Sequence, residues 1–338
     1  MDLIEVLDGG LLTTVQDAGR FGFQRYGVPV SGAMDLFALR AANRLVGNPD
    51  EAAGLEMTLV GPRLRFVAPA TIAVTGADLG ARLDGAALPT WQSVLLEPGA
   101  ELWFAGPQCG VRAYLAVAGG ADVPLVLGSR STYTRSRIGG LEGRKLQADD
   151  ALHIPGGRPV LLGGTLHLPA PHRPVWGHAH ALRVVLGPQD DRFTAAGIKT
   201  FLASTYTVGP QSDRMGYRLS GPRIEHLRGP DIISDGTPFG AVQVAGDGVP
   251  IVLLADRGTA GGYTKIATVI GPDIPTLAQA VPGDTVTFES VGLAEAYAAV
   301  HEQEERLAAI SPLGRASDTA RLRRVAAAVA AVVVSLER

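Results

Sequence analysis

The sequence predicts a mainly β protein with two β-rich lobes, a few helices and a helix near the C-terminus. Glycine (43) and proline (23) are frequent among the 338 residues but follow no repeat, which indicates many tight turns. Short runs rich in β-branched and apolar residues lie between these turns, as in a sandwich or a barrel. Helical periodicity occurs in only a few segments.

The expected strands fall into two groups, one in each half of the chain. In the first half they occupy residues 63–68, 71–76, 93–98, 101–106 and 112–119. In the second half they occupy residues 181–187, 241–246, 250–256, 266–271 and 284–290. Glycine or proline bounds most of these runs, so each is expected to be a short strand between turns.

Two segments have a helical pattern. Residues 35–46 place apolar side chains on one face, with Asp35 as a candidate N-cap and Gly47 at the end. Residues 291–309 show a second apolar stripe. The most apolar window, residues 325–334, is about half the roughly 20 residues that a membrane span needs. We therefore expect a terminal helix that packs on this chain or on a partner, and no membrane insertion.

These elements predict three regions. We expect an N-terminal β-rich domain over 1–170, a C-terminal β-barrel domain over 180–290 and a helical tail over 291–338. The stretch 166–183 is rich in proline and has no period, so it is read as a linker. It also carries four histidines: His167, His172, His178 and His180. Because no acidic or cysteine partner lies at a known zinc spacing, no metal site is expected.

Composition excludes several function classes. The net charge is −3, the pI is about 6.2 and charged residues make up 19 %, which argues against a nucleic-acid surface. The single cysteine, Cys109, cannot form an intramolecular disulfide and fits a reducing cytoplasm. An apolar run follows Cys109, so it is expected to be a small buried residue. The acidic first residues do not form a signal peptide, and the protein is expected to be cytoplasmic.

Four polar loops are the candidate sites. The opening loop TTVQDAGRFGFQRYGVPVSGAMD (13–35) and the loop GSRST (128–132) form one cluster, with Gln16, Asp17, Arg20, Ser31, Asp35, Arg130 and Ser131. The loops SDRMG (212–216) and DRGTAGGYTK (256–265) offer a second set: Arg214, Met215, Asp256, Gly261, Gly262, Tyr263 and Lys265. Arginine forks bind carboxylates or phosphates, and paired glycines let backbone N–H groups approach an anion. The structural alternative is that these residues only cap helices and hold turns.

Several common catalytic motifs are missing. The sequence has no GxxxxGK[ST] phosphate loop, no GxGxxG opening a helix and no GxSxG nucleophile elbow. It has no Ser-Ser-Lys amidase signature and no biotin-accepting Met-Lys-Met stretch, so no covalently bound biotin is expected on this chain.

Longer blocks of sequence resemble a known family. The opening loop, AANRLVGNPDEAAGLEMTLVGPRLRF (41–66), RAYLAVAGGADVPLVLGSRST (112–132), SDRMGYRLSGP (212–222) and IVLLADRGTAGGYTKIATVIGPD (251–273) follow in the family's order. The chain resembles the biotin-dependent carboxyltransferase-like family over about residues 3–290. Members are called allophanate hydrolase subunit 2 or the C subunit of 5-oxoprolinase, and the carboxyltransferase domain of urea carboxylase is related.

The resemblance implies a fold, partners and an activity. It implies a cyclophilin-like β-barrel architecture and a cyclophilin-like partner, called subunit 1 or the B subunit, in a hetero-oligomer. With a third, lactam-utilisation subunit, such a complex hydrolyses 5-oxoproline to glutamate with ATP, which is the implied cofactor. The chain would then be one part of a hydrolase acting on cyclic amides and active only in complex. The alternatives are a urea-type carboxyltransferase component, or a non-catalytic protein that antagonises a kinase-inhibitor partner.

The resemblance also assigns residues. Gln243 matches a glutamine of the family's IQV strand, Lys265 follows the Gly-Gly-Tyr of 261–263, and Arg214–Met215 match an Asp-Arg-Met block. The family's DRQTTGGYPK reads DRGTAGGYTK here, and its IQVP reads VQVA, which puts the loop shape and substrate in doubt. We expect Lys265 to stabilise negative charge on an amide oxygen and Gln243 to hydrogen-bond a small amide substrate. Arg214 is expected to hold a carboxylate or phosphoryl oxygen, and Asp256 to orient Lys265 or act as a base.

Overall fold

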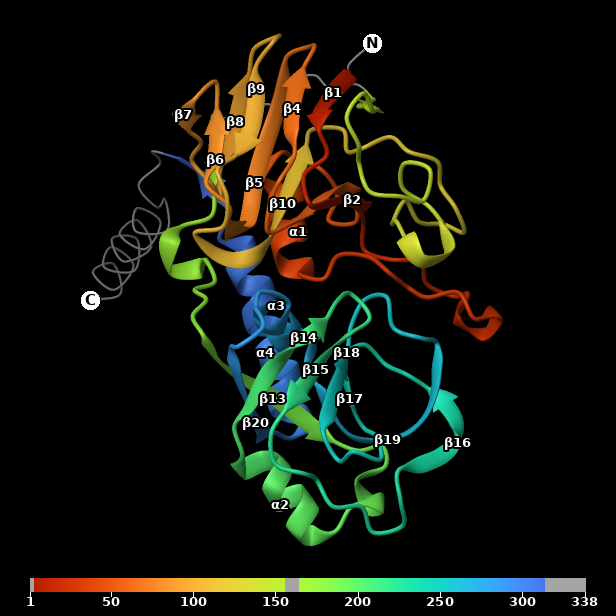
Figure 1. The fold of residues 1–338 in the computed structure, drawn as a ribbon. Coiled ribbons are helices and arrows are strands. Elements are labelled where there is room, and N and C mark those ends of the chain that lie inside the picture. Colours follow the sequence, from red (N-terminus) through yellow and green to blue (C-terminus); the bar gives the residue numbers. More distant parts are fainter. Residues whose placement is uncertain (1–2, 156–163, 314–338) are drawn as a thin grey trace, which may run out of the picture.

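The computed structural model describes residues 3–155 and 164–313, which form two β-rich lobes (Figure 1). The first lobe contains two antiparallel sheets. Its six-stranded sheet has the order β11 (Ala151–His153), β1 (Leu3–Asp8), β4 (Arg63–Phe66), β9 (Glu101–Phe104), β6 (Ala81–Leu83), β7 (Ala86–Ala87). Its five-stranded sheet has the order β2 (Leu12–Gln16), β3 (Gly54–Thr58), β10 (Cys109–Val117), β5 (Ala70–Asp78), β8 (Ser93–Leu96).

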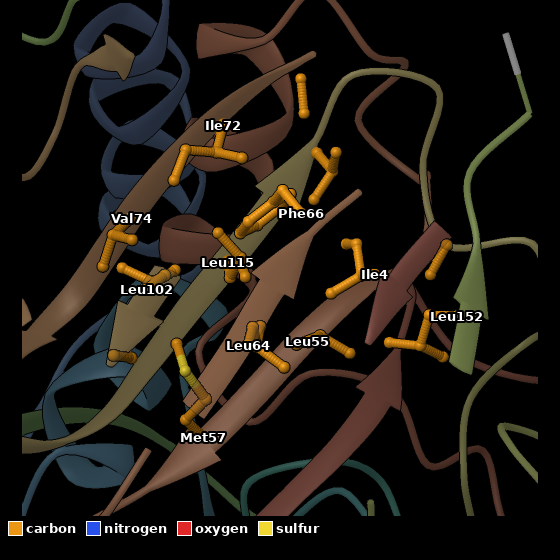
Figure 2. Packing of buried hydrophobic residues seen from close by; sticks show 14 of the residues in the cluster. Ile4, Leu55, Met57, Leu64, Phe66, Ile72, Val74, Leu102, Leu115 and Leu152 are labelled. Atoms are coloured by element: carbon orange, nitrogen blue, oxygen red, sulfur yellow. The ribbon is translucent and has the colours of Figure 1, made fainter. Parts of the chain in front are cut away.

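Alternating apolar side chains from the two sheets meet in the core of the first lobe (Figure 2). The six-stranded sheet contributes Ile4, Leu64, Phe66, Leu102 and Leu152, and the five-stranded sheet contributes Leu55, Met57, Ile72, Val74 and Leu115. Each of these side chains is at most 2 % exposed. The sandwich is therefore a rigid support for the loops that leave its edges.

The second lobe is a sheet that closes on itself. Its order is β13 (Ala179–Leu186), β20 (Thr285–Ser290), β14 (Tyr206–Ser212), β15 (Gly216–Ser220), β18 (Pro250–Leu253), β17 (Ala241–Val244), β19 (Ala260–Val269), β16 (Asp231–Gly236). Strands β13 and β19 also pair, through Val184 and Val269, so seven strands form a closed ring and β16 is attached outside it. The mainly β prediction is confirmed, and the closed ring agrees with the expected barrel.

Four helices complete the fold of the described residues. They are α1 (Leu36–Leu45), α2 (Ala195–Ala203), α3 (Ile274–Ala278) and α4 (Leu293–Ala308), with short 3-10 turns η1 (Gln24–Tyr26), η2 (Thr134–Ser136), η3 (Ala170–His172), η4 (Asp190–Arg192) and η5 (Gly271–Asp273). The predicted cap of α1 is present, because Asp35 Oδ1 accepts a hydrogen bond from the Ala38 N–H at 2.9 Å. Within the described ranges, no helix has the length and apolarity of a membrane span.

Each lobe also packs around an apolar side chain that comes from the other part of the chain. Met34, from the opening loop, is fully buried in the core of the second lobe. In return, Leu307 of α4 packs with Phe37 and Leu39 of α1, on the first lobe. A two-residue strand after α4, β21 (Ser311–Pro312), then pairs with β12 (Leu166–His167). The chain therefore crosses between the lobes more than once.

Three local predictions need correction or qualification. Cys109 is exposed, because it is the first residue of β10 and lies before the buried part of that strand. The predicted linker 166–183 ends inside β13, whose first residues already alternate between exposed and buried. In α4 the apolar stripe is mostly exposed, with Leu293 at 63 % and Tyr297 at 66 % exposed, and only Leu307 is fully buried at its end. The apolar window 325–334 lies outside the described residues.

Candidate functional site

Adjacent strands bring Gln243 and Lys265 together. In the antiparallel pair β17–β19, Gln243 lies directly opposite Lys265, which places their Cβ atoms about 5 Å apart on one face. Val242 and Val244 belong to the barrel core, so Gln243, between them, projects from the opposite face. Both side chains are nonetheless buried, with Gln243 7 % and Lys265 0 % exposed.

The Lys265 ammonium is only loosely satisfied. Its Nζ lies 3.2 Å from Oδ2 of Asp235 but makes no well-directed hydrogen bond to any described residue. The neighbouring ammonium holds the pKa of Asp235 below its ordinary value. Gln189 completes the cluster, because its Nε2 donates to Asp235 at 3.3 Å and its Oε1 accepts from the Lys265 backbone N–H at 3.1 Å. A buried ammonium with unused donors is suited to bind a polar oxygen.

Gly261 makes room for the Gln243 amide. A Cβ atom on Gly261 would lie 2.6 Å from Nε2 of Gln243 and 3.2 Å from Cγ2 of Thr237. The amide keeps only a long contact of 3.5 Å to the Tyr263 carbonyl. Gly262 has no such close neighbour, since its nearest atom to a Cβ is the Ile232 carbonyl oxygen at 3.6 Å. The first glycine of the pair is therefore the one that the site requires.

A cavity of about 350 Å³ lies near this cluster at the junction of the lobes, but neither Gln243 nor Lys265 lines it. It is lined by Gln24 and Val30 of the opening loop and by Gly236, Thr237, Pro238, Arg257, Gly258 and Thr259 of the second lobe. Thr237 touches both the cavity and the space beside Gln243. The volume falls within the range of small-molecule sites. A larger cavity of about 470 Å³ lies in the first lobe, around Val60 and Trp103, and none of the predicted site residues lines it.

Arg214 and Asp256 pair with each other and do not lie beside Lys265 as expected. Arg214 Nε donates to Asp256 at 2.9 Å, Nη1 donates to Glu56, and Nη2 donates to the Gly32 carbonyl at 2.7 Å. Burial alone lowers the pKa of Arg214, but Glu56 and Asp256 raise it well above its ordinary value. Ser31 donates to the other oxygen of Asp256 at 2.8 Å.

This network joins the two lobes, since Glu56 and Ser31 belong to the first and Arg214 and Asp256 to the second. The expectation that Arg214 holds a substrate oxyanion is therefore wrong, because its N–H groups already donate to protein carboxylates and a carbonyl. Asp256 does not orient Lys265 either, because its carboxylate pairs with Arg214 while Lys265 lies beside Asp235. Met215 lies in the turn between β14 and β15, where its N–H donates to Asp213 at 2.7 Å.

The second predicted cluster holds the opening loop in shape. Asp17 accepts hydrogen bonds from Ser129 at 2.7 Å, from the Arg130 N–H at 2.6 Å and from Ser131. Arg20 donates to the carbonyls of Val126 and Ser131, both at 2.8 Å. These bonds fasten the loop to the segment 126–132.

The other members of that cluster have different hydrogen-bond partners. Gln16 donates to the Thr132 carbonyl at 3.1 Å. Asp35 caps α1 and accepts from Gln279 at 2.9 Å. Ser31 belongs to the network between the lobes. The predicted residues do not form one pocket, and what the loop contributes to the cavity is Gln24 and Val30.

The structure supplies partners that the sequence does not reveal. His178 and His180 lie 2.7 and 3.1 Å from the two carboxylate oxygens of Asp284, which is more than 100 residues away. Burial raises the pKa of Asp284, but the Val281 N–H and the imidazoles hold it below its ordinary value overall. Asp235, Gln189 and Gln24 were missed as site residues because no motif marks them. Arg257 lies in the same predicted loop as Lys265 and is one of the polar residues that this loop offers.

Comparison with known proteins gives a consistent answer. A family model described as "Carboxyltransferase domain, subdomain A and B" matches residues 26–290. The C subunit of 5-oxoprolinase from Escherichia coli is 39 % identical over 302 residues, covering 89 % of this chain and 96 % of that protein. The protein of the same name from Haemophilus influenzae is 38 % identical, covering 87 % and 93 %.

A solved structure extends the likeness to the fold. The urea amidolyase of Kluyveromyces lactis superposes with a TM-score of 0.85 at 31 % identity, over 90 % of this chain. This chain spans only 20 % of that solved chain. The matched residues include both lobes and the cluster around Lys265. The chain belongs to the carboxyltransferase domain family, subdomains A and B.

Proposed function

We propose that the chain is one component of a 5-oxoprolinase-type complex that opens the small lactam 5-oxoproline to glutamate. The complex would include a cyclophilin-like B subunit and a lactam-utilisation subunit, and would work in the cytoplasm. Support comes from the two relatives named as the C subunit of 5-oxoprolinase, which match this chain over 96 % and 93 % of their own lengths. The observation that carries the proposal is the buried Lys265 ammonium opposite the Gln243 amide, beside a small cavity.

These two side chains offer complementary interactions with an amide. Lys265 would donate to the lactam oxygen, where negative charge develops when a nucleophile attacks the carbonyl carbon. The Gln243 amide, which has only one long contact, would hydrogen-bond the N–H or carbonyl edge of the lactam. Asp235 and Gln189 would hold Lys265 in place. Because Lys265 is out of contact with water, its interaction with the developing charge is strengthened.

ATP enters this proposal only as a co-substrate of the complex. Across residues 3–155 and 164–313, no group of three or more His, Cys, Asp or Glu side chains could hold a metal ion. The chain also has no phosphate loop. No step on this chain is assigned to ATP.

The test is turnover of the reconstituted complex with Lys265→Met. Removal of one oxyanion donor is expected to lower kcat by about 10²–10³-fold. Lys199→Met is the matched control, because Lys199 is exposed on α2 and should leave turnover unchanged. Circular dichroism and co-purification with the other components would show that the variant folds and assembles. Wild-type turnover in Lys265→Met would refute the assigned role.

A urea-type carboxyltransferase component is the second candidate. It is favoured by the TM-score of 0.85 to a urea amidolyase and by the description of the family model. In that case Lys265 and Gln243 would bind urea, and the carboxyl group would arrive on biotin carried by another domain. The reconstituted complex distinguishes the two, since only the first candidate consumes ATP in response to 5-oxoproline.

A further inference from the structure

Arg257, which is partly buried, differs from the buried Arg214 in what it binds. Its Nε donates to the Thr237 carbonyl at 2.7 Å, and its Nη1 donates to the Leu254 carbonyl at 3.2 Å. The guanidinium carbon lies 5.3 Å from the centre of the Phe239 ring. These contacts fix the plane of the guanidinium group but bring it no negative charge. Arg214, by contrast, is paired with two carboxylates.

No carboxylate within the described ranges forms an ion pair with Arg257. Burial lowers the pKa of Arg257 to about 10, with no opposing contribution from an acidic neighbour. The guanidinium is partly buried and has no counter-ion among the described residues, so it can bind an anionic group that enters the cavity.

The remaining donors of Arg257 are available to the cavity that it lines. A guanidinium has five N–H donors, and two are engaged by the carbonyls. Gln24 lines the same cavity from the first lobe, and its Oε1 accepts from the Gly22 N–H at 2.9 Å. The Gln24 amide nitrogen has no partner among the residues the structure describes, so it too can donate. Donors from both lobes therefore line one space of about 350 Å³.

Glycine keeps this space open. A Cβ atom on Gly236 would meet no atom within 4 Å, and one on Gly258 would have only the Ala260 carbonyl oxygen at 3.4 Å. Both residues line the cavity, and neither has a positive φ that would require glycine. The missing side chains therefore leave room for a guest rather than relieve backbone strain.

We propose that this cavity is an oxyanion-binding site in which Arg257 and Gln24 bind the carboxylate of a small ligand. An arginine fork matches the two oxygens of a carboxylate, and phosphate offers the same chemistry. Where the ligand is taken to be 5-oxoproline, the inference rests on the proposed function. Thr237 lines this site and also lies beside the space around the Gln243 amide, although Gln243 itself does not line the cavity. Neutral guests such as urea would lack the charged contact.

The test is calorimetric titration of the full chain with sodium 5-oxoproline, inorganic phosphate, 2-pyrrolidinone and urea. The carboxylate should bind saturably, and 2-pyrrolidinone, the same ring without the carboxylate, should not. Arg257→Gln should weaken carboxylate binding by about tenfold or more, since a charge-assisted hydrogen bond is lost. Arg173→Gln is the matched control, because Arg173 also donates to a carbonyl and lacks a carboxylate partner but lines no such cavity.

A second variant guards against a folding defect. Gly236→Val adds a side chain at the cavity wall, where a Cβ atom would meet no atom within 4 Å, and should also weaken binding, while the thermal unfolding midpoint stays near that of the wild type. If phosphate binds more tightly than 5-oxoproline and Arg257→Gln weakens that binding, the cavity is confirmed as an oxyanion site and its ligand is phosphate. Equal binding of the carboxylate by the wild type, Arg257→Gln and Gly236→Val would overturn the proposal.

The reconstituted complex separates this inference from the proposed function. Arg257→Gln should raise KM for 5-oxoproline by about tenfold and change kcat less, because the carboxylate contact is made in the bound substrate as well as in the transition state. Turnover with an unchanged KM in Arg257→Gln would refute the site and leave the function standing. Arg257-dependent binding without turnover of 5-oxoproline would leave the site standing and refute the function.

Discussion

Replacement of Arg214 by methionine should weaken the fold severely. The substitution keeps most of the volume but removes the cation that lies between Glu56 and Asp256. These carboxylates are 1 % and 4 % exposed, so neither can be solvated by water in the variant. Loss of one partner of a buried ion pair costs about 3–5 kcal/mol in the free energy of unfolding. Because two carboxylates lose their counter-ion here, we expect a loss of unfolding free energy at the upper end of that range.

The cost of Arg214→Met should also depend on pH. In the wild type, burial raises the pKa of Glu56, but Arg214 and Arg112 hold it below its ordinary value overall. Without Arg214 the Glu56 carboxylate would take up a proton more readily, so acid relieves part of the penalty. The difference in unfolding free energy between variant and wild type should therefore be smaller at pH 5 than at pH 8.

Equilibrium unfolding in urea measures both effects. The matched control is Arg218→Met, on the neighbouring strand, because Arg218 forms an exposed pair with Asp247 at 3.2 Å. That control should cost at most about 1 kcal/mol. Adding Glu56→Gln to Arg214→Met should recover part of the loss. The reasoning fails if Arg214→Met unfolds at the same urea concentration as Arg218→Met, or if its deficit is independent of pH.

Two further substitutions test the cap of α1 and the glycine beside Gln243. Burial raises the pKa of Asp35 to about 6, so the folded state binds this proton more tightly than the unfolded chain, and the resulting stability is lost as pH rises through 6. As the pH rises from 4 to 7, the wild type should therefore lose on the order of 3 kcal/mol of unfolding free energy relative to Asp35→Asn. A difference in unfolding free energy between the two proteins that does not change with pH would contradict this. Gly261→Ala should displace the Gln243 amide and reduce turnover of the complex, while Gly262→Ala, whose Cβ meets only ordinary contacts, should not. Equal turnover of the two alanine variants would show that the close approach at Gly261 is unimportant.

Features with local causes could be predicted from the sequence. The cap and the apolar face of α1 are set within a dozen residues, and the helix lies where the pattern places it. The strands from Arg63 to Val117 lie between turn residues that mark their ends. Cys109 shows the limit of such reasoning, because the apolar run after it belongs to the buried part of β10 while Cys109 itself lies at the exposed end.

Features set by distant contacts could not be predicted. The partner of Lys265 is Asp235 of β16, a strand whose residues are nearly all exposed and do not alternate, so no pattern marks it. Arg214 looks like a ligand-binding residue because Asp213 precedes it and polar residues surround it. Its true partner Glu56 is 158 residues away, and only the packing of the two lobes brings them together. The same packing turns Asp256 toward Arg214 and away from Lys265.

The exchange of Met34 and Leu307 between the cores has a consequence for biosynthesis. As the chain leaves the ribosome, α1 is made early, yet Leu307, which covers part of its apolar face, is made more than 260 residues later. The barrel, in turn, receives Met34 from a segment already synthesised. The surface of the amino-terminal sandwich therefore remains incomplete until the barrel has formed and α4 has been synthesised. Nascent chains arrested before residue 307 should accordingly expose this apolar surface and depend on chaperones.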